Sequence, residues 1–152
     1  MKYSLPEIER RWLVDLEAIG SLEGVGFTVI EDTYFPETRL RLRKMTAFDG
    51  ICQYKLCKKY GKQSELTEPI TNLYLTEGEY TLLAKLPGKR IRKCRYKLAT
   101  GSLDIFEIPA DAPAVFEKEF PSEEDAMAYT PPAFVLTEVT PDSEHTCANL
   151  AV

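Results

Sequence analysis

The stretch TRLRLRKM, residues 38–45, has an arginine at every second position and leucines between them. Because strand side chains alternate between two faces, the pattern predicts a strand with one cationic and one apolar face. AFDG (47–50) then has the Asp-Gly pair typical of a tight turn, and ICQYKLCKKY (51–60) is expected to return antiparallel. Its Lys55 and Lys59 share one face, so two cationic strands become neighbours.

The rest of the chain predicts mostly strands, separated by short turns. Further strands are expected at 3–14, 26–35, 65–75, 90–99, 102–108, 114–120 and 134–139, and short helices at 15–22, 76–86 and 121–129. Pro69 predicts an edge or a bulge in its strand. The fold class is therefore mainly β (α+β): a single domain over 1–152, with about eight strands in an antiparallel barrel or sandwich and a few peripheral helices.

Composition excludes several functional classes. The chain has 152 residues, 44% of them hydrophobic and 28% charged, which argues against disorder. It has no apolar run long enough for a membrane span or a signal peptide, so we expect a cytoplasmic protein without membrane partners. The single histidine, His145, and the absence of a C-x-x-C pair argue against a zinc site or a His-based nucleophile; the cysteines are Cys52, Cys57, Cys94 and Cys147.

Charge is strongly segregated along the chain. The formal net charge of −5 argues against general nucleic-acid binding. However, residues 39–97 hold 15 of the 19 Lys and Arg and only 5 of the 24 acids, a net of +10, which leaves −15 for the rest. Such asymmetry indicates a function that handles charge.

Strand parity shows where like charges converge. Three basic residues, Lys93, Arg95 and Lys97, share one strand face, whereas the acids Glu7, Glu9, Glu117 and Glu119 share the faces of two other strands. Neighbouring like charges destabilise a sheet unless a ligand neutralises them. Carboxylates suit Mg²⁺ or Mn²⁺, and cations suit phosphate. We therefore expect a barrel lumen that binds a metal and a phosphate chain.

Seven short motifs, in order and over essentially the whole chain, resemble the CYTH domain of the triphosphate tunnel metalloenzymes. EIERR (7–11) resembles the family's ExExK signature; the others are TRLRLRK, YKLCKKY, RKCRYKL, LDIF, FEKEF and TEVTPD. The resemblance implies an eight-stranded antiparallel, tunnel-like β-barrel with charged residues pointing inward. It also implies a Mg²⁺- or Mn²⁺-dependent enzyme whose small-molecule substrate carries a triphosphate.

Site roles follow from the resemblance. Glu7, Glu9, Glu117 and Glu119 are expected to bind the metal and, with Arg11, to be catalytic. The expected substrate-binding residues are Arg11, Arg39, Arg41, Arg43, Lys55, Lys59, Lys93 and Arg95. Asp104 matches a family acid that could support a metal or a base, or it is an ordinary aspartate.

Two departures from the family pattern affect the mechanism. Arg11 replaces the signature lysine, and because a guanidinium stays protonated it cannot serve as a general base. The family's R-x-E-x-E strand reads ELTEPITN here, so the acids of that strand, Glu65 and Glu68, are not assigned to the site.

Hydrolysis of inorganic tripolyphosphate is the function that we expect, with metal and acids positioning water and the basic residues neutralising charge. Cyclisation of ATP is the first alternative; it requires a base-stacking aromatic, for which Tyr34, Tyr54, Tyr74 or Phe106 are candidates. A non-catalytic binder of polyphosphate or nucleotide is the second. The sequence leaves metal preference and oligomeric state (monomer or homodimer) open.

Overall fold

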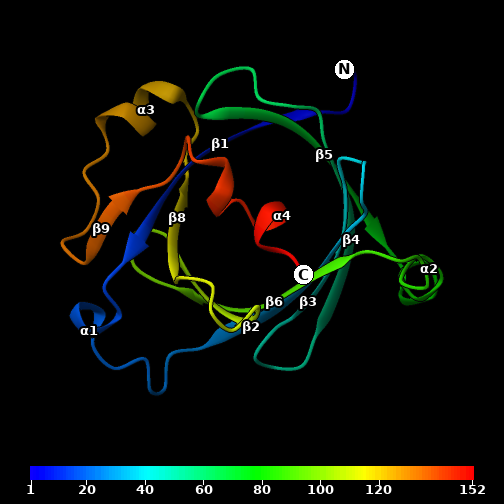
Figure 1. Cartoon of the computed structure of the whole chain (residues 1–152), viewed down its shortest axis with the longest axis horizontal. Helices are drawn as coiled ribbons and strands as arrows, with labels where there is room; N and C mark the ends of the chain where they lie inside the picture. The colour runs from blue at the N-terminus through cyan, green and yellow to red at the C-terminus, as the bar shows by residue number, and fades with distance from the viewer.

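Eight antiparallel strands close into a barrel in the computed structural model, which describes residues 1–152 (Figure 1). The strands are β1 (Leu5–Val14), β2 (Phe27–Tyr34), β3 (Leu40–Thr46), β4 (Cys52–Lys59), β5 (Thr67–Leu75), β6 (Lys89–Lys97), β7 (Ser102–Ile108), β8 (Val115–Glu119) and β9 (Val135–Glu138). Hydrogen bonds link them in the order β5-β4-β3-β2-β6-β7-β8-β1, and pairing of β1 with β5 closes the ring. The ninth strand, β9, pairs with the last residues of β1 outside the barrel.

The observed topology confirms the antiparallel barrel and excludes the sandwich. Strand order follows from hairpins: β3 pairs with β4 in the register Arg43↔Lys55 and Arg41↔Cys57, as the 47–50 turn predicts. Gly50 in that turn has a φ of +85°, a conformation that glycine adopts without strain. The two cationic strands are therefore neighbours, as expected.

Pro69 marks the closing seam of the barrel. It lies opposite Pro6 in the pairing of β1 with β5, so two residues without an N–H face each other there. The predicted edge or bulge is not observed, because β5 is paired on both sides, with β4 and β1, and neither pairing has a register shift.

Short helices cover the outside of the barrel, as expected. They are α1 (Leu16–Ile19), α2 (Glu77–Leu83) and α3 (Glu123–Ala128), and a capping box of Thr76 and Glu79 starts α2. Under β9 and α3, Trp12 packs against Phe116 and Tyr129 with ring centroids 5.8 and 5.9 Å apart. None of the helices combines the length and the apolar character that a membrane crossing requires.

The last helix lies inside the ring of strands rather than outside it (Figure 1). A 3₁₀ turn (Ser143–His145) leads into α4 (Cys147–Leu150). Ala151, after α4, packs with Ile91, Phe106 and Val115, and Leu150 packs against the same cluster. This apolar cluster closes one end of the barrel and leaves the charged lumen above it.

Candidate functional site

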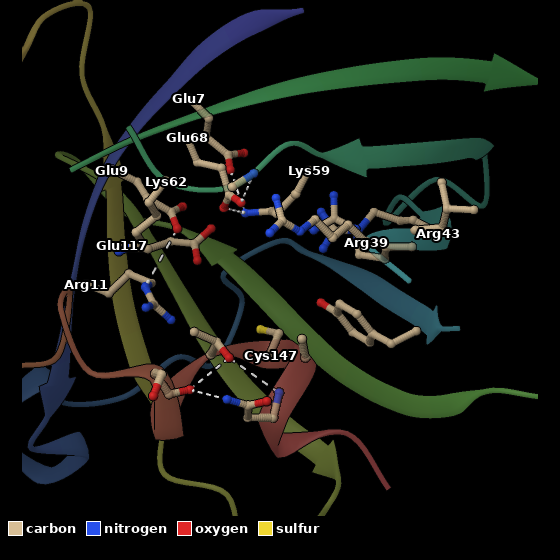
Figure 2. Close-up of a pocket in the computed structure, with 18 of the residues that line it drawn as sticks. Glu7, Glu9, Arg11, Arg39, Arg43, Lys59, Lys62, Glu68, Glu117 and Cys147 are labelled. Atoms are coloured by element: carbon tan, nitrogen blue, oxygen red, sulfur yellow. Dashed lines mark hydrogen bonds and ion pairs between the residues drawn. The ribbon is translucent and has the colours of Figure 1, made fainter. Parts of the chain in front are cut away.

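A cavity of about 620 Å³ occupies the barrel interior (Figure 2). Thirteen of its 22 lining residues are charged, so it suits a small, highly charged ligand rather than an apolar one. The predicted site residues that line it are Glu7, Glu9, Arg11, Arg39, Arg41, Arg43, Lys59, Lys93, Arg95, Glu117 and Glu119.

Strand parity explains this convergence. β1 and β8 pair in the register Glu9↔Glu119 and Arg11↔Glu117, so all four side chains project to the same face of the sheet. The cations come from β3, β4 and β6.

Lys55 is the one predicted site residue that the cavity does not include. It lies opposite Arg43 on the neighbouring strand, and its ammonium nitrogen is 5.0 Å from the centre of the exposed Tyr74 ring. Its assignment to substrate binding stays a prediction, because parity gives the face of the strand but not how far along it the cavity extends.

The structure adds several residues that the sequence prediction missed. Asp32 accepts two hydrogen bonds from Arg43, at 2.6 and 2.7 Å, with its carboxyl fully buried. Glu68 lies 3.4 Å from Lys59 in the lining, although the sequence pattern led us to leave it out. Lys62 and residues of the segment before and within α4 also line the cavity, together with Tyr34, which the sequence offered only as a candidate for base stacking.

Glu68 could have been found by parity, since it faces Glu7 in the β1–β5 register. Asp32 shares the inner face of β2 with Tyr34, because Asp32 pairs with Arg43 and Tyr34 with Arg41. The site residues were predicted from like charges at alternate positions of one strand. Neither Glu68 nor Asp32 belongs to such a pair.

Asp104 holds two cations of the tunnel. Its buried carboxylate accepts from Lys93 Nζ at 2.5 Å and from Arg95 Nε and Nη2 at 2.7 Å each. Burial opposes ionisation of this group, but Lys93 and Arg95 keep the pKa of Asp104 well below its usual range. Arg95 also forms an ion pair with Glu117. Asp104 therefore positions Arg95 directly and Glu117 indirectly, through Arg95.

Arg41 is the one basic residue of the lining whose side chain forms no hydrogen bond or ion pair within the protein; its Nε is buried without a partner. By contrast, Lys59 contacts Glu7 at 2.8 Å and Arg39 Nη1 donates to the carbonyl of Tyr60. An unsatisfied guanidinium is costly to keep in a partly buried position, so its five donors favour an anionic ligand.

Two acids of the lining have few partners of their own. Glu9 and Glu119 form no hydrogen bonds through their carboxylates, and the nearest cation to Glu9 is Arg11 Nε at 3.7 Å. Burial, and then Glu117 and Glu7, raise the pKa of Glu9 to about 7. Burial, Glu7 and Glu117 also raise the pKa of Glu119.

The acidic side chains fit a hard divalent cation by their chemistry. All four predicted ligands offer carboxylate oxygens, and their mutual repulsion is what a divalent cation relieves. Glu7 and Glu117 are engaged with Lys59 and Arg95, and no three acids are already arranged around a common point as metal ligands.

Glu9→Gln is expected to stabilise the metal-free protein at pH 8 by about 2 kcal/mol and to have little effect at pH 5. Between pH 4.5 and about 7 the unfolded chain releases the Glu9 proton while the folded chain retains it, so stability falls as the pH rises. Thermal unfolding in a chelator at both pH values measures the difference.

The exposed Glu23→Gln is the control, for which we expect the same small change at both pH values. Equal stability of Glu9→Gln and wild type at pH 8 would show that the Glu9 carboxylate is not under repulsion.

Comparison with solved structures finds similarity over almost the whole chain. One structure, described as that of the hypothetical protein NE1496, superposes with a TM-score of 0.57 and 26% identity over 95% of this chain and 96% of that chain. Another, described as that of the inorganic triphosphatase NE1496, gives 0.57 and 27% over 95% and 97%. No family model and no curated protein matches the sequence.

Proposed function

We propose that the chain belongs to the CYTH, or triphosphate tunnel, family and that it is a Mg²⁺- or Mn²⁺-dependent triphosphatase that hydrolyses inorganic tripolyphosphate. The observation that carries the proposal is the unpartnered guanidinium of Arg41 in a charged cavity that also holds Glu9 and Glu119, whose carboxylates accept no hydrogen bond. The similarity to an inorganic triphosphatase supports hydrolysis of a triphosphate.

The aromatic residues support a substrate without a base. Tyr34 is the only aromatic residue in the lining, and its hydroxyl faces Asp32 at 3.5 Å. The other candidates for stacking a base lie elsewhere: Tyr54 packs on Tyr80, Tyr74 is exposed beside Lys55, and Phe106 belongs to the apolar cluster around α4.

Glu7, Glu9, Glu117 and Glu119 would hold the metal. When bound, a divalent cation neutralises phosphate oxygens and makes a bound water more acidic. The chain's own contribution is positional and electrostatic: Arg41 and Arg39 donate to phosphate oxygens, and Lys93 and Arg95 present fixed charge because Asp104 orients them. Arg11 is permanently protonated, so its role excludes base catalysis.

A substrate panel tests the proposal. Tripolyphosphate, thiamine triphosphate and ATP are incubated with Mg²⁺ or Mn²⁺, and both phosphate and cyclic AMP are measured. We expect metal-dependent phosphate release, fastest from tripolyphosphate. Cyclic AMP from ATP would favour the cyclase alternative, and calorimetric binding of tripolyphosphate without phosphate release would favour the non-catalytic binder.

Gly61→Ala is expected to raise the KM for tripolyphosphate roughly fivefold by displacing Arg39. Gly61 has a φ of +96°, and a Cβ there would overlap the Arg39 guanidinium at the cavity wall. Steady-state kinetics measures the effect. Gly50→Ala, with a φ of +85° but open space around its Cβ, is the control and should leave the KM unchanged.

A further inference from the structure

Two consecutive arginines on opposite faces of β1 bind the same stretch of chain, residues 138–146, here called the C-terminal segment. On the outer face, Arg10 donates to both carboxylate oxygens of Glu138, at 2.8 and 2.6 Å. On the inner face, Arg11 Nη1 donates to the carbonyl of His145 at 2.9 Å. The hydrogen bonds of Arg10 and Arg11 together hold the C-terminal segment in place where it passes from β9 into the barrel.

Arg11 makes further contacts with this segment. Its Nη2 lies 3.4 Å from the carbonyl oxygen of Thr140 and 3.5 Å from that of Val139. Its backbone N–H donates to Thr140 Oγ1 at 2.9 Å, and its carbonyl accepts from the N–H of Val139 at 2.8 Å. Arg11, Val139 and Thr140 are all at least nine-tenths buried, so water does not compete for these contacts.

A second cation reaches the same point from the β4–β5 loop. Lys62 Nζ donates to the carbonyl of Thr140 at 3.1 Å. The arrangement places two positive charges on backbone carbonyls of one short segment. Figure 2 shows Arg11 between the acids of the tunnel and the helix that carries Cys147.

The held segment determines the shape of the cavity. Ser143, Thr146, Cys147, Ala148 and Asn149 form part of the lining, and α4 with Ala151 fills one end of the barrel. If the segment moved, that wall and the closed end would move with it.

We propose that Arg11 is a positioning residue that clamps the C-terminal segment, fixes the closed end of the tunnel, and so limits the substrate to short phosphate chains. The substrate part of this proposal rests on the proposed function; the clamp itself does not. The clamp depends on the guanidinium, because one planar group reaches several carbonyls at once, which a lysine ammonium cannot do with the same geometry.

Arg11→Lys, which introduces the family's signature residue, tests the clamp by hydrogen exchange of the substrate-free protein. The amides of Thr146, Asn149, Leu150 and Ala151 are hydrogen-bonded within this region, and we expect them to exchange at least tenfold faster in the variant. Arg41→Lys, the same chemical change at a residue without protein partners, should leave their exchange unchanged. Unchanged exchange in Arg11→Lys would overturn the proposal.

Lys62→Gln provides a second variant in case Arg11→Lys does not fold. Lys62 is exposed, and its loss removes one contact to Thr140 without altering β1. We expect faster exchange of the same amides, by a smaller factor. Exchange equal to that of the wild type would argue against the clamp.

Selectivity for phosphate chain length is a second measurement, and a general loss of protein stability does not change it. The ratio of kcat/KM for long-chain polyphosphate to that for tripolyphosphate is expected to rise about tenfold in Arg11→Lys and to stay constant in Arg41→Lys. A constant ratio in both variants would refute the length limit. If the wild type hydrolyses neither substrate, the proposed function fails while hydrogen exchange still decides the clamp.

Discussion

Glu117→Gln is expected to lower kcat for tripolyphosphate about a thousandfold and to weaken the dependence of the rate on Mg²⁺ or Mn²⁺. Glu117 lies in the lining next to Arg11 in the β1–β8 register and forms an ion pair with Arg95. The amide keeps the shape of the side chain but removes its charge, so it binds a divalent cation poorly and no longer balances Arg95. Phosphate release as a function of metal concentration measures both effects.

Glu107→Gln is the matched control. Glu107 is also a strand glutamate in an ion pair with an arginine, Arg92, but the pair lies on the outer surface of the barrel. We expect wild-type kinetics from it. Metal-dependent hydrolysis at the wild-type rate in Glu117→Gln would contradict the assignment of the acid cluster.

The alternation of side chains along the strands predicted most of the site, because each strand side chain of a barrel points either into the lumen or outward. Once Arg39, Arg41 and Arg43 share the face opposite to Leu40 and Leu42, the register of a closed sheet brings them to the lumen. The same alternation predicts the acids of β1 and β8.

What the sequence did not reveal depends on contacts between distant strands. Asp32 belongs to the site because β2 pairs with β3, which brings it to Arg43, and its own strand shows no charge pattern. No local pattern in the sequence indicates that α4 lies inside the barrel. That position results from apolar packing against Ile91 and Phe106, residues more than 40 positions away.

Arg41→Met is expected to lower kcat/KM for tripolyphosphate about a hundredfold, mainly through KM, while changing the free energy of unfolding by less than about 1 kcal/mol. The side chain has no partner in the protein, so its removal leaves no group unsatisfied. The ligand, by contrast, loses a charged donor. Steady-state kinetics and urea unfolding of the same variant measure the two quantities.

Arg43→Met is the comparison that makes the result specific. Arg43 is two residues from Arg41 on the same face of β3, but removal of its guanidinium leaves the buried Asp32 carboxylate unpaired. We therefore expect about 3 kcal/mol of destabilisation from it. If Arg41→Met were as destabilising as Arg43→Met, Arg41 would be a structural residue. If Arg41→Met kept the wild-type KM, phosphate would bind elsewhere in the cavity. If Arg41→Met keeps the stability of the wild type but binds tripolyphosphate more weakly, the role of the Arg41 side chain is to bind the substrate and not to stabilise the fold.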